Sequence, residues 1–585
     1  MQEQDREDGP LSPRAKRNHP TPVEYFERAE DPELQRQPPL TVPPTDPGGS
    51  IRAFIGPLCR GWILIVDMPQ GGLSMRHTTF TLLAAGLLAL GVASATSGSI
   101  RTPQAEATPL AATPVVDSSN EARRAIVPAG PGGILGAENY GIAVTALAVA
   151  ASEGTTQNAA AALPPGNTVA QWNKIAEDTV VGSGAFQGEG FIYMAYASTA
   201  VYNAVVAIAG GYEPMDSTIT APAGASVDCA VVEAAYRTLR YYFSSFPVLV
   251  ANLDTDYAEA FSPSNLDGCT ADGGAGTSVG MAAANEVIYN RTTGPNPDGR
   301  ITPIGVSTPF PTLSSGPGVW RLTPPFAAPQ TPWVGNVRRF VLPSVDQFLP
   351  DPPPSLQSVE WVEAFNQIKA YGAANSSLRS DEQTAIARFW SANVIRQYNG
   401  VGRDIAAARG LGLLETAQLA AMVNLVGADA LMSALYAKYH YLLWRPVTAI
   451  DPTAVTADSF GPVPGYDDGN PATVEQTGWR PLLTTPNHPE YPAAHGVITS
   501  AMAEVFSTFL GTNQIGLDIH GFDAAGPAGN LNAVRHFDMP NDLRHEIVDA
   551  RLWAGLHYHF SGVAGVVLGR KVASFDLNHA FRPVD

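Results

Sequence analysis

Basic residues are scarce in this sequence of 585 residues: 35 lysines and arginines stand against 54 acidic residues, and the formal net charge is −19. A nucleic acid needs a basic stripe to neutralise its phosphates, so this balance argues against a nucleic-acid partner. An acidic surface also repels other anions at long range. Any anion site must therefore be a local cationic pocket. The lysines that follow residue 96 are Lys174, Lys369, Lys438 and Lys571.

Cysteine is also sparse, and the sequence contains only Cys59, Cys229 and Cys269. The last two lie downstream of a predicted export signal. An even pair of cysteines in an exported chain is a candidate for a disulfide. Two unpaired thiols remain the alternative, because sequence spacing does not fix the distance between them.

The predicted export signal covers residues 75–95. Met75-Arg76-His77 is followed by an apolar run from Phe80 to Val92 and then by Ala93-Ser94-Ala95. A positive start, a short apolar run and small residues before the cleavage point are typical of a secretory signal peptide. The run is shorter than the roughly 20 residues of a membrane-spanning helix, which disfavours the alternative of a membrane anchor. We therefore expect a secreted protein, located in the periplasm or outside the cell.

The segments on either side of this signal lack a regular pattern. Residues 1–74 are polar and proline-rich, so we expect them to be disordered. Our hypothesis is that translation starts at Met75, which N-terminal sequencing of the secreted protein would test. Residues 96–165 are rich in Ala, Thr, Pro and Gly, as a flexible leader is.

The remainder of the chain is predicted to be mainly α, with two packed helical bundles. Helical patterns indicate a first bundle over residues 166–290 and a second over residues 357–585. Prolines interrupt residues 291–356, which predicts a long surface connection. Strand signals are sparse. The predicted helices cover residues 192–204, 230–243, 279–289, 358–371, 381–395, 415–444, 493–510 and 541–572.

Three segments of the second bundle carry the charged residues of interest. The first is Lys438-Tyr439-His440-Tyr441-Leu442-Leu443-Trp444-Arg445-Pro446. Positions seven apart on a helix differ by only about 20° in direction, so Lys438 and Arg445 are predicted to share one face, and Pro446 to end the helix. Two cations on an apolar face cost desolvation and repulsion unless an anion joins them. The alternative is that both side chains reach solvent from the helix end.

The second segment is His488-Pro489-Glu490-Tyr491-Pro492-Ala493-Ala494-His495-Gly496, which precedes an apolar helix. The free N–H groups and the dipole at a helix N-terminus favour an anion. A histidine at this point can exchange protons near neutral pH. The alternative for His495 is a capping or buried structural role.

The third segment is Arg551-Leu552-Trp553-Ala554-Gly555-Leu556-His557-Tyr558-His559-Phe560-Ser561. Arginine offers a planar fork that suits a tetrahedral oxyanion. His557 can act as a nucleophile or a ligand through one ring nitrogen, and Gly555 lets another backbone approach. Zinc at His557 and His559 is a weaker alternative, because no further ligands stand at supporting spacing.

Taken together and in this order, the three segments resemble the vanadium-dependent haloperoxidase and type 2 phosphatidic acid phosphatase superfamily, in its bacterial haloperoxidase-like branch. That family has Lys-x6-Arg-Pro, then Pro-Ser-Gly-His, then Ser-Arg-x3-Gly-x-His-x3-Asp. The resemblance extends over roughly residues 168–583, through Gly318-Val319-Trp320, Glu382-Gln383, Phe389-Trp390 and the approach from Asp429 to Lys438.

The sequence departs from this family pattern at small residues. The first segment is complete, but Ala493 and Ala494 replace serine and glycine in the second. In the third, Ala550 replaces serine and Ser561 replaces aspartate. Ala493 removes a hydroxyl that would bond an oxyanion, while Ala494 keeps its backbone N–H. Ser561 cannot supply the negative charge that would orient His557, so its hydroxyl or a backbone carbonyl is the expected partner.

The resemblance implies helical bundles of the vanadium haloperoxidase type and a vanadate cofactor, whose site phosphate can also occupy. It implies that Lys438, Arg445 and Arg551 hold the equatorial oxygens, beside the backbone of Ala493 and Ala494. His557 would bond the central atom, as vanadium ligand in a haloperoxidase or as nucleophile in a phosphatase. His495 would be the acid–base. Lys438, His495 and His557 are thus the candidate catalytic residues.

The leading interpretation is an exported vanadium-dependent haloperoxidase that oxidises halide with hydrogen peroxide and serves a small organic acceptor. We expect the mature chain to lack the transmembrane spans that integral lipid phosphatases need, which favours a haloperoxidase over a lipid phosphatase. His488 lies where the segment resembles His-Pro-x-Tyr-Pro-Ser-Gly-His of bromoperoxidases, which implies bromide or iodide rather than chloride; a surface loop histidine is the alternative. The other functions considered are a soluble secreted acid phosphatase with His557 as nucleophile and a non-catalytic oxyanion-binding protein.

Overall fold

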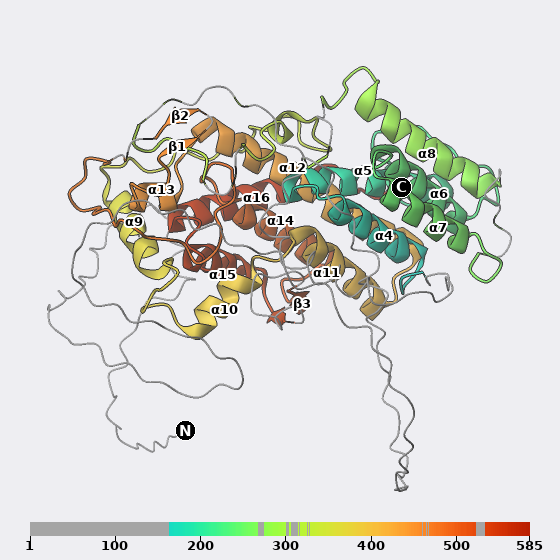
Figure 1. Ribbon diagram of the computed structural model, residues 1–585. Coiled ribbons are helices and arrows are strands. Elements are labelled where there is room, and N and C mark those ends of the chain that lie inside the picture. The colour runs from blue at the N-terminus through green and yellow to red at the C-terminus, as the bar shows by residue number, and fades with distance from the viewer. Residues whose placement is uncertain are drawn as a thin grey trace, which may run out of the picture. The chain divides into compact units, whose positions relative to one another are not determined.

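The computed structural model describes residues 163–584, apart from stretches within 267–273, 300–315, 324–327, 459–466 and 522–532. The predicted disordered region, the signal peptide and the leader up to residue 162 lie outside the described residues. Within the described residues the fold is mainly helical, as predicted (Figure 1).

The first half of the fold is built from helices that pack through aromatic and small residues. In α5, Tyr196 is fully buried and stacks on Tyr242 of α6 with ring centroids 4.5 Å apart. The small residues between such aromatics let neighbouring helices approach closely, as the sequence pattern predicted. The helices are α4 (Thr168–Gly182), α5 (Gln187–Ala209), α6 (Val227–Tyr242), α7 (Pro247–Ala260) and α8 (Ala275–Thr292).

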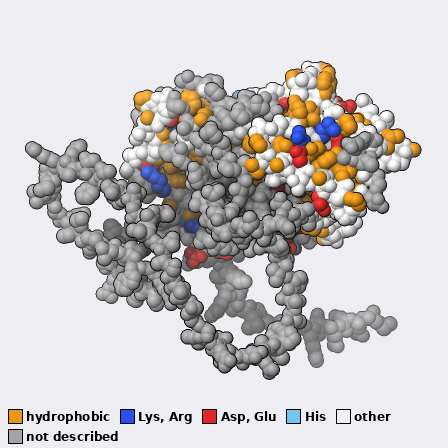
Figure 2. Space-filling model, turned by 45° about the vertical axis from the view of Figure 1, so that its right-hand side comes forward, with side chains coloured by type: hydrophobic (Ala, Val, Ile, Leu, Met, Phe, Trp, Pro, Cys, Tyr) orange, Lys and Arg blue, Asp and Glu red, His pale blue; other side chains and the backbone are white. Residues whose placement is uncertain are grey.

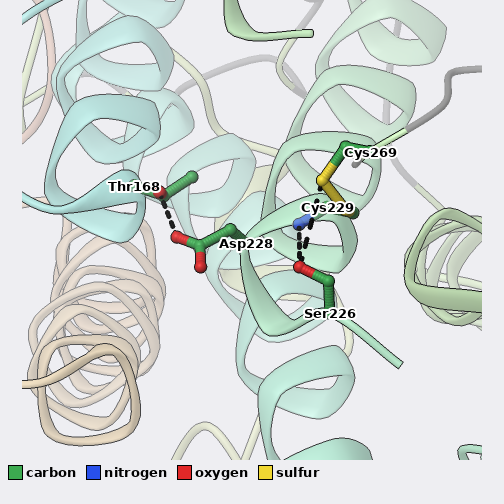
Figure 3. Close-up of a disulfide and its surroundings, with 5 residues drawn as sticks. All are labelled: Thr168, Ser226, Asp228, Cys229 and Cys269. Atoms are coloured by element: carbon green, nitrogen blue, oxygen red, sulfur yellow. Dashed lines mark hydrogen bonds between the residues drawn. A yellow bond between two sulfur atoms is a disulfide. The ribbon is translucent and has the colours of Figure 1, made fainter. Parts of the chain in front are cut away.

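A disulfide ties the start of α6 to the connection that precedes α8 (Figure 3). Ser226 caps α6 by accepting a hydrogen bond from the backbone N–H of Cys229, and the sulfur of Cys229 is bonded to that of Cys269. Asp228 of the same first turn accepts a hydrogen bond from the hydroxyl of Thr168, where α4 begins. The candidate pairing of the two cysteines is therefore confirmed.

Removing this disulfide with the paired substitutions Cys229→Ser and Cys269→Ser should lower the free energy of unfolding by about 4 kcal/mol. The bridge spans 40 residues, and closing a loop of that length removes much of the conformational entropy of the unfolded chain. Denaturant titration of the oxidised protein and the double variant measures the difference. The reduced wild-type protein is the control, and a variant with an unchanged midpoint would contradict the expectation.

The described second half of the fold contains both long and short helices. They are α9 (Val359–Tyr371), α10 (Asp381–Phe389), α11 (Val394–Arg409), α12 (Leu413–Tyr441), α13 (Pro446–Ile450), α14 (Ala494–Leu510), α15 (Pro540–Trp553) and α16 (His559–His579). Two antiparallel hairpins join β1 (Ala457–Asp458) to β2 (Gly461–Pro462) and β3 (Leu517–His520) to β4 (Val534–Phe537). The 3-10 helix η3 (Val334–Asn336) packs on α12.

The two halves share one hydrophobic core. α12 packs along α5 on one side and along α14 on the other, and α14 packs on α16 (Figure 1). Among the described residues, α5 and α12 are long and apolar enough to cross a membrane, but 89% of the apolar window of each is buried inside the protein. Their apolar character is therefore accounted for by their place in the core.

Three of the helices were predicted as continuous, and the structure interrupts them or ends them earlier. The helix predicted over 381–395 is divided between α10 and α11, because the side chain of Asn393 caps a new helix by accepting from the N–H of Ile395. The helix predicted over 415–444 ends at Tyr441, because Leu442 adopts a left-handed conformation with φ 53°. The one predicted over 541–572 is interrupted at Gly555, where φ is 77°. Each break changes where the following side chains point.

The prediction that residues 291–356 form a surface connection is wrong for several described residues. Trp320 and Val334 are fully buried. The backbone N–H of Trp320 donates to the carbonyl of Leu442 at 2.7 Å, which joins the connection to the turn after α12. Proline prevents a regular helix, but it does not prevent apolar side chains from entering a core.

Basic side chains are few on the described surface. On the face in Figure 2, Lys and Arg side chains occur in small separate groups among hydrophobic and uncharged ones. Within the described part that this view shows, no basic stripe is visible. This agrees with the acidic balance of the sequence.

Candidate functional site

The first segment places its two cations on different elements. Lys438 lies in the last turn of α12, whereas Arg445 lies beyond the turn at Leu442 and immediately precedes Pro446, the first residue of α13. The prediction that both share one helix face, with Pro446 ending that helix, is therefore wrong. Proline suits the first position of a helix because its missing N–H would have no partner there.

Both cations nevertheless donate hydrogen bonds to the same short stretch of the second segment. We call this stretch, residues 488–490, the strap. The ammonium of Lys438 donates to the backbone carbonyls of Pro489 and Glu490, at 2.9 Å each. The guanidinium of Arg445 donates through Nε to the carbonyl of His488 at 2.9 Å and through Nη2 to His488 Nδ1 at 3.0 Å. Lys438 and Arg445 are fully buried, so water does not compete for these bonds.

His557 of the third segment stands between Arg445 and Glu490. Its Nε2 is 3.2 Å from Nη1 of Arg445, and its Nδ1 is 2.9 Å from Oε1 of Glu490. A guanidinium can only donate, so Nε2 accepts and Nδ1 carries the proton that is donated to the carboxylate. This arrangement fixes the tautomer that presents a lone pair at Nε2.

The partner of His557 is a residue that the sequence analysis missed. Neither the hydroxyl of Ser561 nor a backbone carbonyl meets Nδ1, and the carboxylate of Glu490 does. The hydroxyl of Ser561 instead lies 3.4 Å from the carbonyl of Glu490. One signal could have identified Glu490: it is a carboxylate between two prolines in a segment expected at a buried site, and a buried carboxylate needs a partner.

The second and third segments are held together by close packing of α14 and α16. A Cβ on Gly569 of α16 would lie 2.0 Å from the carbonyl oxygen of Val497 in α14, so only glycine allows this approach. The N–H of Ala493, the capping residue of α14, donates to the carbonyl of Ser561 at 3.0 Å. Gly555 likewise admits the backbone of Gly372, as predicted, because a Cβ there would lie 2.4 Å from that carbonyl.

A cavity of about 60 Å³ brings the predicted site residues to one place. It is lined by His488, Ala494, His495, Arg551 and His557. Lys438 and Arg445 lie behind this lining, where they contact the strap and His557. Ala493 caps α14 beside the cavity, and its side chain does not add a polar group.

Three helices begin at this cavity. Gln187 starts α5, Val394 starts α11 and Ala494 starts α14, and all three line the cavity wall. Helix N-termini carry partial positive charge and unpaired N–H groups, so their convergence favours an anion. The first bundle thus contributes to the site, which the sequence analysis did not predict.

The charges around the cavity are not balanced. Lys438, Arg445 and Arg551 interact with one another, and Glu490 is the acidic partner of the first two. Burial, assisted by the repulsion from Arg445, holds the pKa of Lys438 well below its usual value, and burial lowers the pKa of Arg445 to about 9. Burial raises the pKa of Glu490 to about 7, although Lys438 and Arg445 oppose this. Such a surplus of cations is relieved by an anion.

The histidines are held neutral by the same environment. Burial and then the neighbouring cations lower the pKa of His495 and of His557 well below the usual range. Among the residues that the structure describes, no hydrogen-bonding group meets the buried Nε2 of His495. Neutral imidazoles in this position can accept a proton or offer a lone pair.

Comparisons with known proteins agree with this arrangement. The VCPO second helical-bundle domain matches residues 418–585. Vanadium chloroperoxidase of Curvularia inaequalis is 24% identical over 297 residues, which cover 41% of this chain and 47% of that protein. The chain thus spans about half the length of this curated relative.

Two solved structures share the fold. A bacterial vanadium-dependent iodoperoxidase superposes with a TM-score of 0.52 at 18% identity, over 72% of this chain and 99% of that one. A holo-type bacterial vanadium-dependent chloroperoxidase superposes with a TM-score of 0.52 at 16% identity, over 74% of this chain and 97% of that one. The resemblance to vanadium-dependent haloperoxidases is therefore confirmed: residues 418–585, which contain all three cationic segments, match the VCPO second helical-bundle domain.

Proposed function

We propose that this protein is a vanadium-dependent haloperoxidase that oxidises halide with hydrogen peroxide. The observation that carries the proposal is the cluster of Lys438, Arg445 and Arg551, three cations against one carboxylate, beside a cavity at which three helices begin. These donors suit a tetrahedral oxyanion. The lone pair of His557 Nε2 suits its central atom once Arg445, which donates to Nε2 in this structure, donates to the oxyanion instead, so the residues fit vanadate or phosphate. Bound vanadate would supply a Lewis acid that activates hydrogen peroxide.

The chain's own residues have separate tasks in this proposal. Lys438, Arg445 and Arg551 neutralise and orient the oxyanion, and His557 bonds it through Nε2. His495, which is neutral and lines the same cavity, accepts a proton from hydrogen peroxide at Nε2. The buried surroundings strengthen each of these interactions because bulk water does not screen them.

The size of the cavity supports small reactants. About 10–15 Å³ of such space is needed for one water, so a cavity of about 60 Å³ has room for about five waters. That space suits an oxyanion with peroxide and halide. A phosphomonoesterase remains the second candidate, because the lone pair at Nε2 of His557 is also the feature that a phosphoryl acceptor needs.

Halide choice and export extend the proposal. His488 lines the cavity, and its Nδ1 lies 3.0 Å from Nη2 of Arg445 and 3.2 Å from the carbonyl oxygen of Pro489. A histidine in this position supports a role in halide selection, with bromide or iodide preferred to chloride. Export is supported by the disulfide between Cys229 and Cys269, which is typical of oxidising compartments.

One assay series tests the proposed function. Bromination, iodination and chlorination of a phenolic dye by hydrogen peroxide are measured with and without added vanadate, and phosphate release from a generic ester is measured in parallel. We expect halogenation that depends on vanadate, fastest with bromide or iodide. Hydrolysis that vanadate inhibits would support the phosphatase instead, and oxyanion binding without turnover would support a binding protein.

A further inference from the structure

We propose that Glu490 is the positioning residue for His557, and that it does from the second segment what the family pattern assigns to an aspartate four residues after the histidine. The inference rests on the proposed function only in taking His557 as the oxyanion-bonding residue. In this chain the family position is occupied by Ser561, which has no negative charge. The geometry around Glu490 supplies a replacement from a different part of the sequence.

One carboxylate oxygen of Glu490 holds the histidine segment at two points. Oε1 accepts from Nδ1 of His557 at 2.9 Å and from the backbone N–H of Tyr558 at 3.0 Å. The first bond orients the imidazole ring, and the second fixes the backbone beside it. Because Glu490 and His557 are buried, water cannot replace either bond without a change in the fold. A partner that orients a ligating histidine in this way also raises the basicity of its other nitrogen.

The backbone of Glu490 connects the same residue to the other cationic segments. Its N–H donates to the carbonyl of Leu443 at 2.9 Å, and its carbonyl accepts from the ammonium of Lys438 at 2.9 Å. The orientation of His557 is therefore tied to the position of Lys438 through one residue. A displacement of Glu490 would move both sides of the site together.

Glu490 and Ser561 form a matched pair. The hydroxyl of Ser561 is fully buried and lies 3.4 Å from the carbonyl oxygen of Glu490. An aspartate at position 561 would place a second carboxylate in the pocket that already holds Glu490, and two buried like charges repel. Serine is thus compatible with Glu490, and an aspartate should be compatible with the site only when the charge of Glu490 is removed.

A mutant cycle tests this pairing in the full chain with inorganic phosphate as the probe. Glu490→Gln keeps the size of the side chain but removes its charge, and it should weaken phosphate affinity measured by calorimetry by about 10- to 100-fold. Ser561→Asp alone should also weaken it. The double variant should recover most of the affinity that Glu490→Gln loses. Glu363→Gln, at an exposed position of α9, is the matched control and should change nothing.

A second readout does not depend on any oxyanion. In protein with ¹⁵N-labelled histidine, the wild type should show His557 protonated at Nδ1, assigned by loss of its signals in His557→Ala. Because Arg445 still donates to Nε2 in Glu490→Gln, Nδ1 should stay protonated, but its ¹⁵N chemical shift should change when a neutral amide replaces the carboxylate as acceptor, and the double variant should restore the shift. If Glu490→Gln does not fold, Glu490→Asp retracts the same charge by one methylene and should also reduce phosphate affinity.

The outcomes separate this inference from the proposed function. Unchanged phosphate affinity together with an unchanged Nδ1 shift in Glu490→Gln would overturn the inference, and so would a double variant as impaired as the two single variants combined. A wild-type protein without vanadate-dependent halogenation would contradict the proposed function only. In that case a changed Nδ1 shift in Glu490→Gln would still support Glu490 as the positioning residue.

Discussion

His557→Ala is expected to abolish the binding of vanadate and of phosphate, and with it all vanadate-dependent halogenation. The substitution removes the lone pair at Nε2 that the proposal assigns to the central atom of the oxyanion. It also leaves Oε1 of Glu490 without the N–H of the imidazole, so a buried carboxylate loses one of its hydrogen bonds beside the site.

Calorimetric titration with vanadate and with phosphate measures this loss. His579→Ala is a suitable control, because His579 lies exposed at the C-terminal end of α16, the helix that follows His557. Thermal unfolding of both variants shows whether the fold is retained. A His557→Ala protein that keeps the wild-type vanadate affinity would remove this residue from the site and would leave the assignment of the third segment without support.

The structure brings residues of the three predicted segments to one cavity, and two signals in the sequence had grouped them: the scarcity of cations, and the resemblance of the three segments, in order, to the family pattern. Lys438 is one of few lysines in the long acidic chain, and Arg445 and Arg551 stand in otherwise apolar segments. Placing such residues without an anion is costly, so their presence indicated an oxyanion site. The mainly helical fold followed from periodicity in the same way, since α14 and α16 show long apolar patterns without strand signals.

The local geometry could not be predicted, because it depends on turns with no strong sequence signature. Leu442 adopts a left-handed conformation that leucine rarely takes, and this turn separates Arg445 from the helix of Lys438. Its conformation is set by tertiary contacts, among them the bond from the N–H of Trp320 to the Leu442 carbonyl. Sequence periodicity carries no information about such a bond.

The contribution of distant elements was missed for the same reason. Gln187 reaches the site from the first bundle, where its side-chain carbonyl accepts from the N–H of Val394 at the start of α11. Glu490 lies in the second segment but acts on His557 in the third. Both relationships join positions far apart in the chain, and only the packed fold brings them together.

His495→Ala is expected to separate binding from turnover. His495 lines the cavity with Arg551 and His557, but the cationic donors and the lone pair at His557 Nε2 remain in the variant. Vanadate affinity should therefore stay within about tenfold of the wild type, whereas loss of a positioned acid–base group costs about 10²- to 10⁴-fold in rate. Burial and the nearby cations keep the pKa of the wild-type imidazole well below the usual value, so the group is neutral before it accepts the proton.

The comparison with His557→Ala makes this expectation specific. Vanadate dissociation constants are measured for both variants and halogenation rates at saturating vanadate for His495→Ala, with His579→Ala as the shared control. A His495→Ala protein that halogenates at the wild-type rate would exclude His495 as the proton acceptor. One that loses vanadate affinity as fully as His557→Ala would show that His495 holds the oxyanion, because removal of a group that acts only on the proton of hydrogen peroxide leaves the ground-state complex intact.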